Sequence, residues 1–160
     1  GGLVHRTWTA GLIGDLAQAN DSAAKRGVAA FSKAVARDLK RWNVRSNGIA
    51  PFAWSRMISS IKTDTKEQKA RVEKVKKMTP AKVAPMACYL MSDRAADGSG
   101  QILAVRKNEI FLFNQARPVR SVHSDDGWTA DEIAERAIPA LKSQFTPLEV
   151  SADVFSWDPV

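Results

Sequence analysis

The chain has 160 residues, of which 44% are hydrophobic and 26% charged, the composition of an ordinary soluble globular protein. A chain of this length can bury a real core, and its length predicts one domain. A single cysteine, Cys88, excludes an internal disulfide, and the sequence has neither a membrane-spanning apolar run nor a signal-peptide pattern, so we expect a cytoplasmic protein.

The net charge of +7 arises partly between Lys62 and Lys77, where seven basic residues accompany three acidic ones. Such a patch can contact nucleic-acid phosphates. Few aromatic residues are interleaved with these lysines, so we favour a solvated helix face and expect no nucleic-acid partner. The segment His123-Ser124-Asp125-Asp126 has no second cluster at ligand spacing, and a surface turn is favoured there over a metal site.

In chain order, the first third predicts two short strands on either side of a long helix. A buried strand begins at Leu3-Val4, and residues 8–15 form a loop of small residues. A helix over residues 18–41 follows, because apolar residues recur near the helical period. Its apolar positions are Ala24, Val28, Phe31, Val35 and Leu39. A second strand over residues 44–50 ends at Pro51.

The middle of the chain predicts two more helices. Residues 62–78 form a polar helix with a narrow apolar stripe at Val72, Val75 and Met78. Thr79-Pro80 begins a helix that reaches about Met91, with threonine as the cap and proline in the first turn. A bend is expected at Pro85, since proline interrupts helical hydrogen bonding.

The last third predicts a pair of strands, a capped helix and a tail. Residues 101–105 and 110–113 read as strands joined by the turn at 106–109. Thr129 with Glu132 forms a capping box for a helix that reaches about Lys142. Residues 145–160, with two prolines and three large aromatic residues, predict an ordered but irregular tail.

The segment Gln18-Ala19-Asn20-Asp21-Ser22-Ala23-Ala24-Lys25-Arg26-Gly27-Val28 resembles the active-site helix of the short-chain dehydrogenase/reductase family. Three further motifs resemble that family in the same order: Asn43 to Pro51, Ser55-Arg56-Met57, and Ser99-Gly100-Gln101-Ile102. The resemblance implies an α/β fold, the C-terminal half of a Rossmann-like doubly wound parallel sheet. It further implies a family domain over residues 1–113 and a C-terminal extension over 114–160 that packs on it.

The resemblance assigns three catalytic positions, of which this chain keeps one. The family's Tyr-x-x-x-Lys motif retains its lysine as Lys25, but Asp21 stands at the tyrosine position and Trp8 at that of the serine. A carboxylate beside Lys25 is favoured in its ionised form, and it is several atoms shorter than tyrosine. Helix capping or an ion pair with Lys25 or Arg26 is therefore the favoured role of Asp21, and packing the favoured role of Trp8.

The cofactor implied by the resemblance is NAD or NADP, contacted by Lys25, Pro51 and Ser55. Phe52 replaces the glycine that follows the family's proline, and no Gly-rich turn between a strand and a helix is present. Binding of NAD or NADP and the absence of any cofactor on this chain are both left open.

Three functions are compatible with the sequence. The first is an NAD(P)-dependent oxidoreductase of alcohols or carbonyl compounds, impaired or inactive as this chain, with a small-molecule substrate if active. The second is a non-catalytic remnant that serves as an oligomerisation or binding module. The third is a repurposed hydrolase or ligand-binding protein. The alanine-rich helix from Ala23 to Leu39 predicts a homo-oligomer, because small residues permit close approach of a second helix.

Overall fold

The computed structural model describes residues 1–54 and 65–160 of the chain. These residues form two compact units, the first made of Gly1–Phe113 together with Glu149–Val160 and the second of Asn114–Leu148. The candidate site lies in the first unit.

The first unit is built on a four-stranded sheet in the order β1(Gly2–Arg6), β2(Arg45–Phe52), β3(Ile102–Arg106) and β4(Glu109–Leu112). The first three strands are parallel, and β4 is antiparallel to β3. Only the residue pair 107–108 separates β3 from β4, and so short a turn can return the chain only in the antiparallel direction. Lys107 takes the left-handed conformation that this turn needs, with φ of 56°. The predicted α/β class and open sheet are confirmed.

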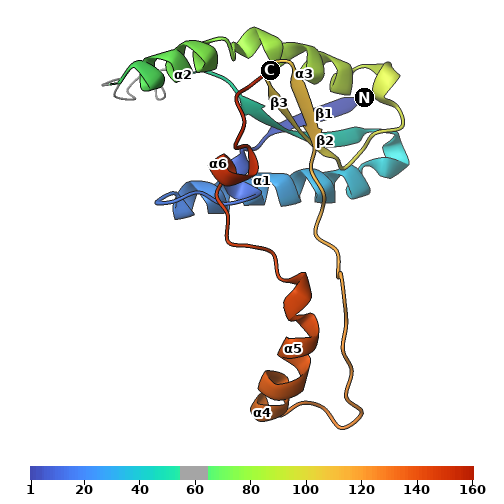
Figure 1. The fold of residues 1–160 in the computed structure, drawn as a ribbon. Coiled ribbons are helices and arrows are strands. Elements are labelled where there is room, and N and C mark those ends of the chain that lie inside the picture. The colour runs from blue at the N-terminus through green and yellow to red at the C-terminus, as the bar shows by residue number, and fades with distance from the viewer. Residues whose placement is uncertain (55–64) are drawn as a thin grey trace. The chain divides into compact units, whose positions relative to one another are not determined.

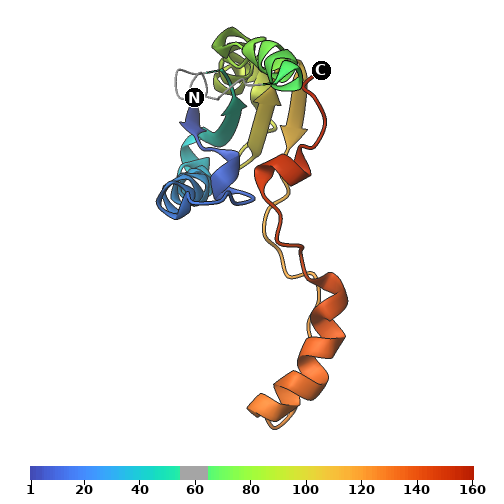
Figure 2. The same ribbon diagram turned by 60° about the vertical axis from the view of Figure 1, so that its left-hand side comes forward.

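Helices cover both faces of the sheet. The long helix α1(Ala19–Asp38) lies on one face, and α2(Lys66–Lys76) and α3(Ala84–Met91) lie on the other, as Figures 1 and 2 show. Successive parallel strands joined through helices give this layered arrangement, because each crossover helix covers a face of the sheet.

Helix α1 turns small residues toward the sheet. Its fully buried residues are Ala29, Ser32 and Ala36, whereas Phe31, one of the apolar positions named in the sequence, is 57% exposed. Small side chains bring the helix backbone close to β2, where the Ser46 hydroxyl donates to the Ser32 carbonyl at 2.8 Å.

Strand β1 is an edge strand of the described sheet, so the prediction that it is buried holds only in part, and Leu3 is 40% exposed. Strand β2 continues through Pro51 to Phe52 and does not end before the proline. Alternate residues of β2 form backbone hydrogen bonds with β1 and the residue after it. The last of these hydrogen bonds joins the Thr7 N–H to the Ile49 carbonyl at 2.8 Å. Pro51 lies beyond that bond, where a strand position needs no N–H donor.

The helices on the second face confirm some of the predicted features and differ in others. Met78 is buried and Val72 and Val75 are half-buried, which confirms the stripe predicted for α2. Thr79 makes no side-chain capping bond; Pro80 begins a short turn, η4(Pro80–Lys82), before α3. Pro85 lies in the first turn of α3 and does not bend it, because N–H groups in the first turn of a helix have no acceptor within the helix.

Residues of the motif Asn43 to Pro51 hold the sheet to the segments around it. The buried guanidinium of Arg45 donates to the carbonyls of Leu90 and Ser92, both at 2.7 Å. The Asn47 amide donates to the Gly98 carbonyl at 3.0 Å and accepts from the Gln101 N–H at 2.9 Å. These hydrogen bonds satisfy the buried polar groups and join β2 to the C-terminal end of α3 and to the loop before β3.

The second unit is one helical segment between extended stretches. Thr129 caps it through the predicted capping box with Glu132, and α4(Ala130–Glu132) continues as a π-helical stretch over Ile133–Ala137 and as α5(Ile138–Leu141). The rest of the predicted tail returns to the first unit and contains one short helix, α6(Ser151–Val154).

Candidate functional site

The candidate site is the edge of the sheet where β1, β2 and β3 end. Ligands of open α/β sheets bind outside the carboxyl ends of the strands. Trp8 follows β1 at this edge, Pro51 and Phe52 end β2, and Arg106 ends β3. The chain thus brings two of the predicted site residues, Trp8 and Pro51, to the end of the sheet where chemistry is expected.

Lys25 is fixed against the segment that follows β1. The Thr7 hydroxyl donates to the Lys25 carbonyl at 2.7 Å. A side-chain carbon built on Gly11 would lie 2.6 Å from the Lys25 Cβ and from the Arg26 backbone nitrogen, so only glycine fits there. Trp8 lies between these two contacts in the chain, and the structure therefore places Trp8 and Lys25 on adjoining segments.

Asp21 lies in the first turn of α1, but it does not cap the helix, since the N-cap is Gln18. Among the ion pairs of residues 1–54 and 65–160, none joins Asp21 to Lys25 or Arg26, which are four and five positions away in the chain. Its carboxylate instead benefits from the positive end of the helix dipole. The predicted capping and ion-pair roles of Asp21 are both replaced by this weaker interaction.

Trp8 is packed into a row of aromatic rings. Its ring centroid lies 5.3 Å from that of Phe52, which in turn lies 5.0 Å from Phe155. Phe155 also contacts Phe111 at 5.1 Å and Trp157 at 5.9 Å. Contacts of this kind stabilise by area burial and by ring geometry. This is the position that the resemblance assigns to the family's serine.

Within residues 1–54 and 65–160, the glycines after β1 do not form a dinucleotide-binding turn. Atoms of α1 occupy the space beside Gly11. Gly14, with φ of 123°, follows it in the loop after β1. Neither belongs to a turn that leads directly from a strand into a helix, which is the geometry that a pyrophosphate requires. Pro51 is buried, and Ser55, the remaining predicted cofactor contact, lies outside the described residues.

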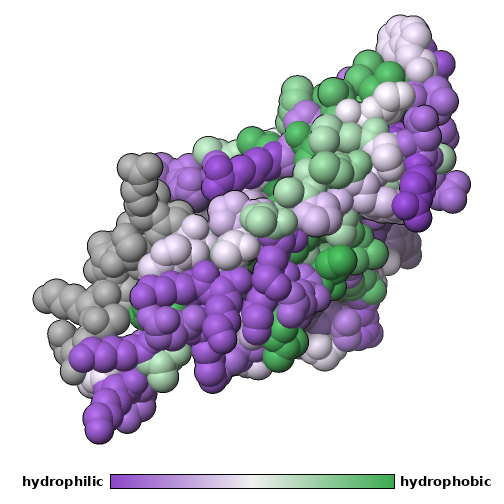
Figure 3. Space-filling view, turned by 90° about the horizontal axis from the view of Figure 1, so that it is seen from above, coloured by the Kyte–Doolittle hydropathy of each residue, from purple (hydrophilic) through white to green (hydrophobic). Residues whose placement is uncertain are grey.

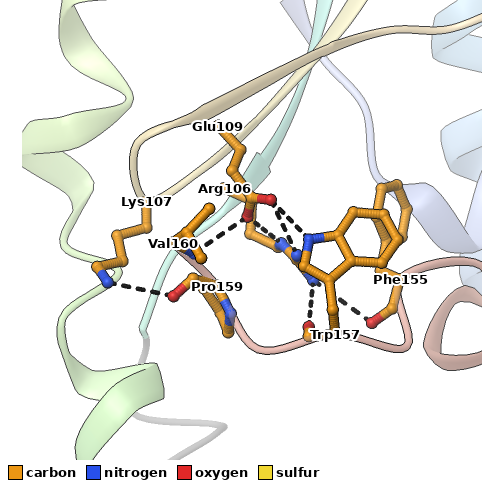
Figure 4. Close-up of polar contacts among 7 residues, drawn as sticks. All are labelled: Arg106, Lys107, Glu109, Phe155, Trp157, Pro159 and Val160. Carbon is orange, nitrogen blue, oxygen red and sulfur yellow. Dashed lines mark hydrogen bonds and ion pairs between the residues drawn. The ribbon is translucent and has the colours of Figure 1, made fainter.

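Arg106 lies at the same edge of the sheet, and it was not predicted from the sequence as a site residue. Its side chain is almost fully buried and donates to both carboxylate oxygens of Glu109, at 2.8 and 3.3 Å (Figure 4). It donates further to the carbonyls of Phe155 and Trp157, at 3.4 and 3.1 Å. The guanidinium also lies 4.7 Å from the Trp157 ring centroid, within cation–π range.

Glu109 accepts the remaining hydrogen bonds of this network. Besides Arg106, it accepts from the Trp157 indole N–H at 2.7 Å and from the Val160 N–H at 3.4 Å. Hydrogen bonding from Arg106, reinforced by the Trp157 bond, holds the pKa of the Glu109 carboxyl below its usual range, although burial opposes the shift. The C-terminal segment is thereby fastened to the β3–β4 hairpin.

A pocket of about 670 Å³ opens between α2, the end of β2 and the C-terminal segment. Phe52, Val75 and Met78 line its apolar part, and Arg71 and Asp158 lie among its polar groups. Figure 3 looks onto the face that carries α2 and α3, where hydrophilic side chains gather at the α2 end and apolar ones become more frequent toward α3. The pocket thus combines an apolar lining with a charged rim.

Residues 1–107 match the family model described as enoyl-(acyl carrier protein) reductase. The chain belongs to the short-chain dehydrogenase/reductase family, whose members generally use NAD(P)H and are typically oligomeric.

Among its relatives, the hydroxyacyl-CoA dehydrogenase ChsB1 of Mycobacterium tuberculosis is 30% identical over 134 residues, covering 83% of this chain and 42% of that protein. The acetoacetyl-CoA reductase of an Acinetobacter species is 32% identical over 107 residues, covering 66% and 43%. A crystal structure of a short-chain dehydrogenase from Mycobacterium avium superimposes with a TM-score of 0.73 at 26% identity, covering 92% of this chain and 47% of that one. The chain therefore spans less than half the length of each of these proteins.

Two further findings bear on other kinds of site. No helix in the described part of the chain is long and apolar enough to cross a membrane. Within residues 1–54 and 65–160, no group of three or more His, Cys, Asp and Glu side chains is placed to hold a metal ion. His123 pairs with Asp125 at 2.9 Å on an exposed turn.

Proposed function

We propose that this chain is the C-terminal, substrate-side half of a short-chain dehydrogenase/reductase domain and that it does not catalyse NAD(P)-dependent turnover by itself. Residues 1–113 would form the family domain and 114–160 its extension. The observation that carries the proposal is the packing of Trp8 on Phe52, at the position that the resemblance assigns to the family's serine. An indole in that position fills space that the substrate carbonyl needs, and hydrogen-bond donors aimed at a developing oxyanion are usually a large part of catalysis.

Asp21 supports the same proposal. A general acid must reach the proton-accepting atom of the substrate within hydrogen-bond distance. The Asp21 side chain is several atoms shorter than tyrosine, and it lies in the first turn of α1. Lys25 keeps its place, but it has no tyrosine to assist. A nicotinamide cofactor would supply hydride, and Lys25 and Pro51 are the described residues that would contact it.

The experiment is a nicotinamide assay of the purified chain. Acetoacetyl-CoA is the test substrate, because a relative is an acetoacetyl-CoA reductase, and NADH and NADPH are supplied in separate reactions. We expect oxidation at the rate of the protein-free control. Steady oxidation that Lys25→Ala abolishes would overturn the proposal, whereas oxidation that survives Lys25→Ala would come from a contaminant.

A second role, as an oligomerisation module, is favoured by the outer face of α1. Ala23, Ala30 and Ala34 are exposed there, and a side-chain carbon built on Gly27 would meet no atom within 4 Å. This face of small residues is open to a second copy of the helix, and Phe31 beside it exposes 57% of its surface. We infer a homodimer that pairs two α1 helices.

Light scattering at micromolar concentration tests the dimer. Ala30→Glu places a charge in the centre of the α1 contact and should give a monomer. Ala81→Glu is the matched control, because Ala81 is equally exposed but lies in η4, on the opposite face of the sheet. A monomeric unmodified chain, or equal effects of the two substitutions, would contradict the α1 dimer.

A further inference from the structure

The C-terminal segment, defined as residues 155–160, is held at two places of very different character. The first is the buried anchor at Arg106, whose guanidinium binds Glu109 and two backbone carbonyls of the segment. The side chains of this ion pair are only 4% and 13% exposed. If the segment moved away, Arg106 would lose two carbonyl acceptors and Glu109 would lose the Trp157 and Val160 donors, so releasing this end is costly.

The second place is a single ion pair with α2. The Lys74 ammonium binds the Asp158 carboxylate, and these side chains are 55% and 53% exposed. Arg71, one turn earlier on α2, adds a favourable charge near Asp158. Ion pairs exposed to this degree contribute little and are weakened by salt, so this contact opens easily.

The pocket of about 670 Å³ lies between these two attachments. Residues of α2 form one wall, the C-terminal segment forms another, and Phe52 and Met78 lie between them. The segment lies beyond residue 107, where the family match ends. This wall therefore lies outside the residues that the family model covers.

We propose that the C-terminal segment acts as a strap that is permanently anchored at Arg106 and reversibly latched to α2 by the Lys74–Asp158 ion pair. With the latch closed, α2 is held against the segment and the pocket is narrow. When the latch opens, α2 gains freedom while the anchor stays in place. Access to the pocket is thus set by one exposed ion pair, whether or not the chain catalyses any reaction.

Amide hydrogen exchange of the full chain tests the latch without any activity assay. Asp158→Asn and Lys74→Met each remove the ion pair while leaving the segment in place. We expect exchange of the α2 amides to rise about two- to fivefold in low salt, the range set by exposed pairs. The exchange of the Asn108 amide, which donates to the Val160 carbonyl, should stay unchanged because it reports the anchor.

Three comparisons make the result specific. Glu73→Gln breaks the neighbouring Glu73–Lys76 pair on the same helix, which does not touch the segment, and should leave α2 exchange near that of the unmodified chain. Lys74→Arg keeps the positive charge that pairs with Asp158 and should retain protection. One molar salt should accelerate exchange in the unmodified chain and have little effect on Asp158→Asn.

The proposal is contradicted if Asp158→Asn leaves α2 protection unchanged, or if Glu73→Gln raises exchange as much as Asp158→Asn does. It is contradicted as well if the Asn108 amide exchanges faster in step with α2, since anchor and latch would then open as one unit.

Discussion

Trp8 lies just after β1 and Phe52 ends the neighbouring parallel strand β2, and their ring centroids lie 5.3 Å apart. The resemblance implies a serine and a glycine at these two positions. The two replacements are coupled, because each ring provides the surface that the other packs on. Through Phe52 the contact continues to Phe155, so the altered site and the C-terminal segment share one aromatic cluster.

If Trp8 serves packing, its removal must cost stability. We expect Trp8→Ala to lower the free energy of unfolding by about 2 kcal/mol, below the range for a fully buried tryptophan because Trp8 is half-buried. Trp42→Ala is the control, since Trp42 is 57% exposed and contacts Arg41 by a cation–π interaction worth about 0.5–1 kcal/mol. Urea unfolding measures both, and equal losses would argue against a packing role.

Much of the fold could be predicted because its signals are local. The segment around Lys25 identifies the family, and Pro51, the apolar stripe ending at Met78 and the capping box at Thr129 place elements within a few residues. The fully buried face of α1 could not be predicted from the spacing of its apolar residues. The sheet accepts Ala29 and Ser32, since close packing of a helix on a sheet selects small side chains.

The candidate site was predictable only where it follows the family motif. Trp8, Asp21 and Lys25 could be aligned by position, but nothing in the sequence paired Trp8 with Phe52. Arg106 escaped prediction for the same reason. Its partners Phe155 and Trp157 are some fifty positions away, and no periodic pattern links residues at that separation.

Ala17 offers a test of backbone strain at the entrance to α1. It has φ of 57°, a left-handed conformation that costs a residue with a side chain about 1 kcal/mol relative to glycine. We expect Ala17→Gly to raise the free energy of unfolding by about 1 kcal/mol. Ala70→Gly, an exposed position inside α2, should instead lower it by about 1 kcal/mol. Urea midpoints that move in the same direction would refute the strain.

Glu109 should make stability depend on acid. Hydrogen bonding from Arg106 lowers the pKa of Glu109 in the folded state, so the folded protein binds its proton less readily than the unfolded chain does. The resulting stability is fully present above the unfolded value of about 4.3 and is lost as pH falls through the lower folded value.

Glu109→Gln should remove that acid dependence and, at pH 7, cost about 3 kcal/mol by leaving the buried Arg106 without its counterion. Glu132→Gln is the matched control. The pKa of Glu132 is also lowered, by the Thr129 hydrogen bonds of the capping box, but Glu132 is exposed and glutamine can serve the same box. Thermal unfolding from pH 7 to pH 3 should separate the two variants, and parallel pH profiles would contradict the role of the Arg106–Glu109 pair.

The central claim is that Trp8 and Asp21 are not working replacements for the family's serine and tyrosine. The most direct measurement joins this chain to the N-terminal half of a related reductase and compares that fusion with one carrying Trp8→Ser and Asp21→Tyr. The repaired fusion should reduce acetoacetyl-CoA with NADH or NADPH about a hundredfold to ten-thousandfold faster, the usual contribution of a general acid. Equal rates in two folded, active fusions would contradict the account and make Trp8 and Asp21 competent catalytic residues.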